Sequence, residues 1–206
     1  MSVDAYQHFH KPAEKGQPLL FLFHGTGGDE NQFVQLGATL LPHAGLVSPR
    51  GDVSEYGASR FFRRTGEGVY DMEDLARATD KMAGFVRAHV EAAQPSAVVG
   101  LGYSNGANIL ASVIFSDPDL FDAAILMHPL IPFKPEIEGS LTTRLLLTAG
   151  RQDPICPAPM TESLEAALKQ AGADTELVWH EGGHELRQSE IEAVARFLEA
   201  SPKMTE

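Results

Sequence analysis

The stretch Gly102-Tyr103-Ser104-Asn105-Gly106 decides how this chain is interpreted. A short apolar run, Ala97-Val-Val99, stands before it, and a mostly apolar run from 107 to 115 follows. The first run predicts a buried strand, and the second is long enough for a buried helix. Ser104 would then lie on a strand-to-helix turn so tight that only glycine fits on either side. We expect this turn to raise the Ser104 hydroxyl above the sheet and to direct the Asn105 backbone N–H toward the same space.

Three glycines around this serine also suggest a dinucleotide-binding loop, which has the pattern G-x-G-x-x-G after a strand. Gly100, Gly102 and Gly106 do not fit that pattern, because the last glycine stands one position too far along. The acidic residue expected about 20 positions later should end a strand, whereas Asp122 precedes one. The sequence therefore favours a G-x-S-x-G turn, which gains its meaning from the strand and helix around it.

The composition is that of an ordinary globular protein, and 206 residues suit one domain, 1–206, with a sizeable core. The net charge of −12 repels nucleic acid and anionic lipid surfaces. The first 16 residues lack the apolar segment of a signal peptide, and no apolar run approaches membrane-spanning length. A single cysteine, Cys156, fits a reducing compartment. We therefore expect a cytoplasmic protein without nucleic-acid partners or membrane insertion.

Buried strands and amphipathic helices alternate along the rest of the chain. This alternation predicts an α/β fold with a mostly parallel central sheet and helices on both faces. About 15 residues separate two of the later strands, too few for a lid of several helices, so no sizeable lid is expected. Strands are expected near 5–10, 19–23, 46–47, 98–99, 123–127, 143–148 and 175–179, and helices from 29 or 31 to 41 and over 71–93, 107–115, 159–171 and 186–200.

Two further residues with catalytic chemistry follow the carboxyl ends of strands. Asp153 lies just past the strand that ends near 148, and His184 lies just past the last strand. Because the loops at that end of parallel strands meet at one edge, we expect both side chains beside Ser104. His184 would take the serine proton and later return it to the leaving group, while Asp153 would fix the histidine tautomer. The chain order Ser, Asp, His is also that of one class of serine hydrolase.

A glycine-rich segment, His24-Gly25-Thr26-Gly27-Gly28, directly follows the strand at 19–23. Glycines at the end of a buried strand permit a tight loop whose backbone N–H groups face a ligand. The backbone N–H of Thr26 is therefore our second candidate, beside that of Asn105, for stabilising an oxyanion. The alternative is a plain glycine-rich turn without a ligand.

Five segments spread over nearly the whole chain match motifs of one enzyme family, at 24–28, 61–64, 102–106, 150–153 and 183–184. Through them the chain resembles the small bacterial α/β-hydrolases of the carboxylesterase/phospholipase family. The resemblance implies an eight-stranded fold shortened at its N-terminus, with Ser104 as nucleophile, Asp153 and His184 as its partners, and oxyanion donors at Thr26 and Asn105. It also implies an acyl-enzyme route for esters or thioesters of small to medium acyl groups, without a cofactor. Members of the family are often dimers, so a homodimer is implied as well.

Residues 180–184, His-Glu-Gly-Gly-His, also spell the zinc-protease pattern H-E-x-x-H. That pattern needs a helix to place His180 and His184 on one face, and its paired glycines cost about 2 kcal/mol of helix propensity relative to alanine. We therefore expect no metal. The alternative is a zinc hydrolase that uses His180 and His184 as ligands. A second alternative is a non-catalytic binding protein of the same fold, which an intact triad argues against. His128 follows a strand at the same edge and is expected to line the pocket.

The long segment from Pro49 to Tyr70 starts at the edge where Ser104 is expected and shows no clear periodicity. Loops of this length are usually functional or disordered, and the apolar pair at 61–62 favours an ordered one. Two aromatics can bury apolar substrate surface, and an arginine can hold a substrate carboxylate. We therefore predict that the substrate pocket includes Phe61, Phe62, Arg63 and Arg64. The alternative is that one arginine only fixes the loop by pairing with Glu67, Asp71 or Glu73.

Overall fold

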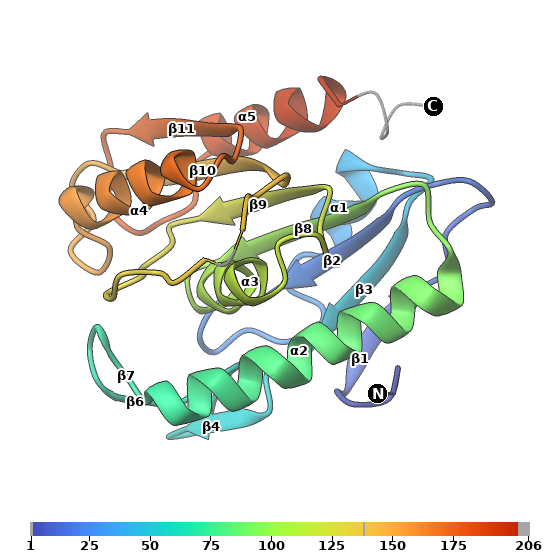
Figure 1. Ribbon diagram of the computed structural model, residues 1–206, viewed down its shortest axis with the longest axis horizontal. Helices are drawn as coiled ribbons and strands as arrows, with labels where there is room; N and C mark the ends of the chain where they lie inside the picture. The colour runs from blue at the N-terminus through green and yellow to red at the C-terminus, as the bar shows by residue number, and fades with distance from the viewer. Residues whose placement is uncertain (1, 138, 202–206) are drawn as a thin grey trace.

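Seven strands form the central sheet of the computed structural model, which describes residues 2–137 and 139–201 (Figure 1). They lie in the order β1-β3-β2-β8-β9-β10-β11, and all neighbours pair in parallel except β1 with β3. The mostly parallel sheet that the sequence predicted is therefore confirmed. Its strands are β1 (His8–Lys11), β2 (Leu19–Phe23), β3 (Gly45–Pro49), β8 (Val98–Tyr103), β9 (Ala123–Met127), β10 (Arg144–Gly150) and β11 (Thr175–His180).

Helices cover both faces of this sheet, and each face has its own apolar cluster (Figure 1). Side chains of β2 alternate between them: Phe21 and Phe23 enter the cluster under α2, α3 and α4, whereas Leu20 and Leu22 enter the cluster under α1 and α5. Both faces of β2 are buried, which explains its unbroken run of apolar residues. The helices are α1 (Val34–Leu40), α2 (Met72–Ala93), α3 (Asn105–Ser116), α4 (Ala158–Gln170) and α5 (Gln188–Glu199).

Helix α2 shows how local sequence sets the ends of an element. The carboxylate of Asp71 accepts a hydrogen bond from the backbone N–H of Asp74 and caps the first turn. The helix ends at Ala93, and its C-cap residue Gln94, which stands directly before a proline, has the left-handed conformation. The predicted helix at 71–93 therefore forms almost as expected. Helix α1 differs, because Phe33 occupies its N-cap position and no side chain caps it.

The segment 49–70, whose lack of periodicity predicted a loop, instead contains two short hairpins. β4 (Val53–Glu55) pairs with β5 (Ala58–Arg60), and β6 (Arg64–Gly66) pairs with β7 (Val69–Tyr70). The first hairpin turns at residues 56–57, which both have positive φ angles, as a tight two-residue turn requires. Strands of two or three residues are too short to show an alternating pattern, which is why the sequence did not reveal them.

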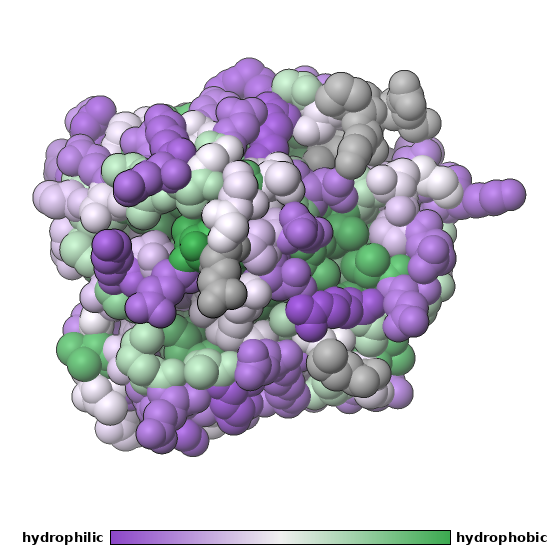
Figure 2. Space-filling view, in the orientation of Figure 1, coloured by the Kyte–Doolittle hydropathy of each residue, from purple (hydrophilic) through white to green (hydrophobic). Residues whose placement is uncertain are grey.

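The segment between β9 and β10 forms neither helix nor strand in its described parts, 128–137 and 139–143. No large lid is therefore built there, as the sequence predicted. Within the described residues, no helix is both long and apolar enough to cross a membrane. The face shown in Figure 2 is mostly hydrophilic, and its hydrophobic side chains form small patches separated by polar ones.

Candidate active site

The serine turn has the strained geometry that its glycines predict. β8 ends at Tyr103, α3 begins at Asn105, and Ser104 between them has φ 53° and ψ −117°. A Cβ atom at Gly102 would stand 2.5 Å from the Gly106 carbonyl oxygen, and one at Gly106 would stand 2.1 Å from the Phe23 carbonyl oxygen. Such distances are far inside van der Waals contact, so the close approach of strand and helix requires glycine at both positions.

The side chains of Ser104, His184 and Asp153 are joined by hydrogen bonds. The Ser104 Oγ lies 2.9 Å from His184 Nε2, and His184 Nδ1 lies 2.7 Å from Asp153 Oδ2. A carboxylate can only accept, so Nδ1 carries the proton and Nε2 is free to accept from the serine hydroxyl. The residues come from the ends of β8, β10 and β11, three parallel strands whose carboxyl ends meet at one edge. The predicted juxtaposition of the three residues is therefore present in the structure.

Asp153 is held by four hydrogen bonds and has no exposed side-chain surface. Its Oδ1 accepts from the backbone N–H groups of Ile155 and Cys156, at 2.8 and 2.9 Å. Its Oδ2 accepts from two histidines, His184 and His128. Burial raises the pKa of Asp153, but these hydrogen bonds outweigh it, and the pKa lies below the ordinary value of 3.8. The carboxylate is therefore ionised and fixed in position.

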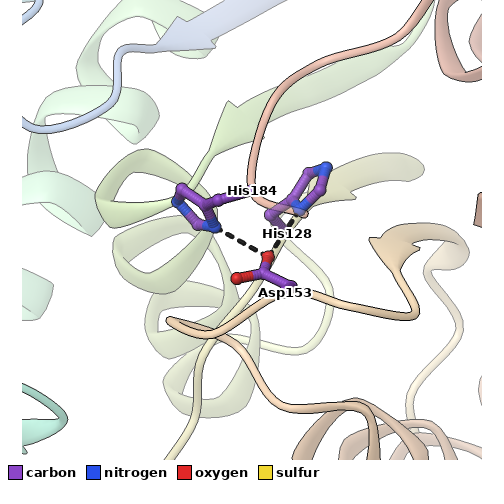
Figure 3. A group of neighbouring side chains, drawn as sticks. All are labelled: His128, Asp153 and His184. Carbon is purple, nitrogen blue, oxygen red and sulfur yellow. Dashed lines mark hydrogen bonds and ion pairs between the residues drawn. The ribbon is translucent and has the colours of Figure 1, made fainter. Parts of the chain in front are cut away.

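His128 occupies the other side of this carboxylate rather than the pocket wall. Figure 3 shows His128 and His184 converging on the same oxygen of Asp153, with His128 Nδ1 at 2.8 Å. The imidazole of His128 is fully buried and its Nε2 lies 3.0 Å from Glu190 Oε1. The expectation that His128 lines the pocket is therefore wrong, because two buried carboxylates draw its ring into the interior.

Glu190, which the sequence did not single out, is the centre of this buried group. Its Oε1 accepts from the hydroxyl of Thr148 at 2.6 Å, and its Oε2 accepts from the backbone N–H of Arg187 at 2.8 Å. His180 Nε2 lies 3.3 Å from Oε2. Glu190 stands three, four and seven positions before buried apolar residues of α5, so the spacing alone could have marked it as an acidic residue facing the core.

The charges in the buried group support one another. Burial lowers the pKa of His128, but hydrogen bonds to Glu190 and Asp153 raise it, and it lies above the ordinary value of 6.5. Burial raises the pKa of Glu190, but hydrogen bonds from His128 and Thr148 lower it below 4.5. His128 is therefore an imidazolium between two carboxylates, with each ring nitrogen donating a hydrogen bond.

Two sets of described residues bring ligand atoms within 4.8 Å of one another, as a metal site would: His128 with Asp153 and His184, and His128 with His180 and Glu190. The hydrogen bonds do not fit metal ligation. The backbone N–H of Gly182 donates to His180 Nδ1 at 2.9 Å, so the ring proton resides on Nε2, the atom that a metal would need. Residues 181–185 are not helical, and His180 and His184 contact different carboxylates. The helical arrangement that the zinc-protease pattern needs is therefore absent from residues 180–185.

Thr26 and Asn105, whose backbone N–H groups are the predicted oxyanion donors, both belong to the wall of the pocket that contains Ser104. Neither Thr26 nor Asn105 donates its amide proton to any group in 2–137 or 139–201, and both residues line the pocket that contains Ser104. The side chains are fixed: Thr26 Oγ1 accepts from Arg60 Nη1 at 2.7 Å, and Asn105 Oδ1 accepts from the Phe61 backbone N–H at 2.8 Å. The two residues predicted to supply amide donors thus lie in the same pocket as Ser104.

The pocket in front of Ser104 has a volume of about 300 Å³. That is at the lower end of the range for small-molecule sites. One wall is fixed by a hydrogen-bonded chain, in which Asn108 Nδ2 donates to the Tyr70 hydroxyl, which donates to the Leu130 carbonyl at 2.6 Å. Both polar and apolar side chains line the space: Thr26, Arg60, Arg64, Glu67, Tyr70, Tyr103, Asn105, Asn108, Leu130, Ile155, Cys156 and His184.

The four residues at 61–64 do not act together as the sequence suggested. Phe61 and Phe62 are fully buried, in the core under α2 and α3, and do not line the pocket. Arg63 points away from it, with 62% of its side chain exposed and ion pairs to Asp71 and Asp74. These three assignments are therefore wrong, because the hydrophobic core takes both aromatics and the loop turns Arg63 toward α2. Arg64 does line the pocket.

A sequence model of the phospholipase/carboxylesterase family matches residues 5–201. The chain belongs to this family. It therefore has the α/β-hydrolase fold and belongs among hydrolases that cleave esters.

Three solved structures are similar over almost the whole chain. The protein Atu2452 of Agrobacterium tumefaciens is 60% identical with a TM-score of 0.93, over 97% of this chain and 98% of that one. A carboxylesterase of Bacillus cereus is 34% identical with a TM-score of 0.88, over 93% and 92%. YahD, solved with malic acid, is 27% identical with a TM-score of 0.86, over 94% and 98%.

Proposed function

We propose that the protein is a carboxylesterase that uses Ser104 as nucleophile, His184 as general base and acid, and Asp153 as the orienting carboxylate. The observation that carries the proposal is the unbroken hydrogen-bonded series from Ser104 Oγ through His184 to Asp153, at 2.9 and 2.7 Å. The half-buried His184 adjoins the pocket, so a bound ester can reach the serine. Family membership supports ester cleavage independently of this geometry.

In the first half of the reaction, Ser104 Oγ attacks the ester carbonyl carbon while its proton passes to His184 Nε2. The carbonyl oxygen becomes negatively charged and is stabilised by the N–H groups of Thr26 and Asn105. His184 then gives the proton to the leaving alcohol oxygen, and the carbon–oxygen bond to the alcohol breaks. Throughout these steps Asp153 keeps the histidine proton on Nδ1.

The second half repeats these steps with water. His184 removes a proton from a water molecule, which attacks the acyl-serine, and the same two N–H groups hold the oxyanion. Collapse of the intermediate returns the proton to Ser104 and releases the acid. The Tyr103 hydroxyl, which donates to the His184 backbone oxygen at 2.7 Å, keeps the histidine loop in place during both halves.

Substrate size follows from the pocket. A volume of about 300 Å³ accepts a short acyl chain, which agrees with the small end of the range expected from the sequence. Thioesters are included in the proposal, because the same nucleophile and oxyanion donors serve a thiol leaving group. The relative solved with malic acid adds small acids that bear a carboxylate to the substrates worth testing.

The decisive experiment is a panel of nitrophenyl esters and acyl thioesters of graded acyl length, run on the wild type and on Ser104→Ala. We expect activity on the shortest acyl groups and its loss in the variant. A serine-directed phosphonate should label Ser104 in the wild type. A Ser112→Ala variant is the matched control, because Ser112 lies on the same helix α3 and contacts Thr79 rather than His184. Labelling of another serine would contradict the proposal.

A further inference from the structure

Two arginines line the pocket of Ser104, and the sequence had singled out only one of them. Arg60, the last residue of β5, has 5% of its side chain exposed, and Arg64, the first residue of β6, has 28%. Within the described residues, one carboxylate reaches both: Glu55 lies 3.0 Å from Arg64 Nε and 3.7 Å from Arg60 Nη1. One partly exposed carboxylate therefore serves two guanidinium groups.

Much of the donor capacity of these groups is unused. Arg60 donates through Nε to the Phe62 carbonyl at 3.3 Å and through Nη1 to the Thr26 hydroxyl at 2.7 Å. Arg64 donates through Nε to both oxygens of Glu55. The Nη2 of Arg60 and both terminal nitrogens of Arg64 have no hydrogen-bond partner in the described part of the chain. A guanidinium with free terminal N–H groups is suited to a bidentate carboxylate.

The charges around the pocket also favour a ligand that carries a single negative charge. Arg60, Arg64 and Glu55 leave a surplus positive charge at the pocket wall, in a chain whose net charge is −12. Glu67 also lines the pocket; it is exposed and forms no ion pair within the described residues, and its charge helps to raise the pKa of Arg64. Burial and the neighbouring charge of Arg64 lower the pKa of Arg60, and Glu55 raises it in part.

We propose that Arg60 and Arg64 form a carboxylate subsite, and that the preferred substrates are small esters carrying a free carboxylate near the scissile bond. The inference rests on the proposed esterase function and names the substrate class of that site. Arg60 contacts Thr26, whose backbone N–H is our oxyanion donor, so a carboxylate held by Arg60 lies beside the reacting carbonyl. A single carboxylate matches the surplus charge, whereas a phosphate dianion exceeds it.

The kinetic test compares acid-bearing and neutral esters of similar size. One pair differs in the acyl group, monomethyl succinate against methyl pentanoate, and the other differs in the alcohol, acetoxyacetate against propyl acetate. Proton release gives kcat/KM for each. We expect the wild type to prefer the acid in at least one pair, and Arg60→Met and Arg64→Met each to reduce that preference by about tenfold or more. The readout is the ratio of kcat/KM for the acid to kcat/KM for the neutral ester of the same pair. This ratio is used because Arg60→Met also loses the contact with Thr26, which should affect all substrates alike.

Arg63→Met is the matched control, because Arg63 is exposed, pairs with Asp71 and Asp74, and does not line the pocket. It should leave the acid-to-neutral ratio at the wild-type value. Arg60→Lys keeps the charge but loses the bidentate fork, so it should reduce the ratio less than Arg60→Met does. Equal losses on both members of each pair, or a wild type that cleaves the acid and the neutral ester of each pair equally well, would overturn the subsite.

Binding separates this inference from the proposed function. Titration calorimetry measures the binding of succinate and of L-malate. For each ligand, the wild type and Ser104→Ala should have the same affinity, and Arg64→Met should bind about tenfold more weakly. Inorganic phosphate, titrated in parallel, should bind more weakly than succinate. If the wild type cleaves none of the esters but binds dicarboxylates through the arginines, the esterase proposal fails and the subsite stands. Phosphate binding as tight as succinate, or no dicarboxylate binding, overturns the subsite.

Discussion

Asp153 accepts hydrogen bonds of almost equal length from two histidines, which lie on its two sides in different surroundings. On one side His184 Nδ1 lies 2.7 Å away, its ring is 17% exposed, and its other nitrogen faces Ser104. On the other side His128 Nδ1 lies 2.8 Å away, its ring is fully buried, and its other nitrogen meets Glu190. Equal geometry thus leads to different roles. The exposed side can move a proton to a substrate, whereas the buried side carries a fixed charge that holds the carboxylate in place.

Asp153 itself should give the largest effect, because it belongs to both sides. For Asp153→Asn we expect kcat for ester hydrolysis to fall by about 10⁴-fold, since the amide no longer enforces the correct tautomer of His184. The free energy of unfolding should fall too, because the His128 imidazolium loses one of its two carboxylates. Steady-state kinetics and urea unfolding measure the two effects. A variant with nearly normal kcat would show that another acid orients His184.

Glu190 tests the buried side alone. Glu190→Gln should lower the free energy of unfolding by about 3 kcal/mol, because it leaves the buried charge of His128 without one of its partners. The same change should lower kcat by less than about tenfold, since Glu190 contacts neither Ser104 nor His184 and acts only through His128. The matched control is Glu192→Gln, an exposed site on the same helix, which should change neither quantity. A loss of kcat as large as that of Asp153→Asn would mean that the two sides are not separate.

His128 predicts how stability depends on pH. Its pKa is raised in the folded protein above the ordinary value of 6.5, so the folded state binds its proton more tightly than the unfolded state. That contribution is fully present below pH 6.5 and is lost as pH rises through the folded pKa. The stability difference between the wild type and His128→Asn should therefore shrink as the pH rises above 6.5. Urea unfolding of both proteins measures it, and a difference that grows with pH would show that His128 is buried in its neutral form.

Treatment with a metal chelator should have the smallest effect on activity and stability. The hydrogen bonds of His180 and His128 leave no free nitrogen for ligation, so prolonged incubation with EDTA should leave kcat and the melting temperature unchanged. Activity assays before and after chelation, with and without added zinc, provide the measurement. Loss of activity that zinc restores would show that one of the histidine clusters binds a metal after all.

Local sequence determined the serine turn and the strands that support it. Gly102 is required by contacts with the first turn of the helix that follows it, so its role at the Ser104 turn is local in the chain. Gly106 is required by the backbone of Phe23 on the neighbouring strand β2, which is a tertiary contact. The apolar runs at 19–23 and 123–127 formed strands with the predicted bounds, because strands buried on both faces are apolar throughout. The meeting of Ser104, Asp153 and His184 followed from parallel topology, which places the carboxyl ends of strands at one edge.

Tertiary structure alone decided which way the side chains of irregular segments point. Phe61 enters the core, whereas Arg60, beside it on a three-residue strand, reaches the pocket, and no periodicity distinguishes the two. His128 could have faced the pocket, but Glu190, 62 positions later, meets its ring from α5. Such choices depend on partners brought together by the fold, because burying a polar group is favourable only where its hydrogen bonds are satisfied. The spacing of residues in the sequence predicts the order of strands and helices, whereas contacts with residues distant in the sequence determine where each polar side chain points.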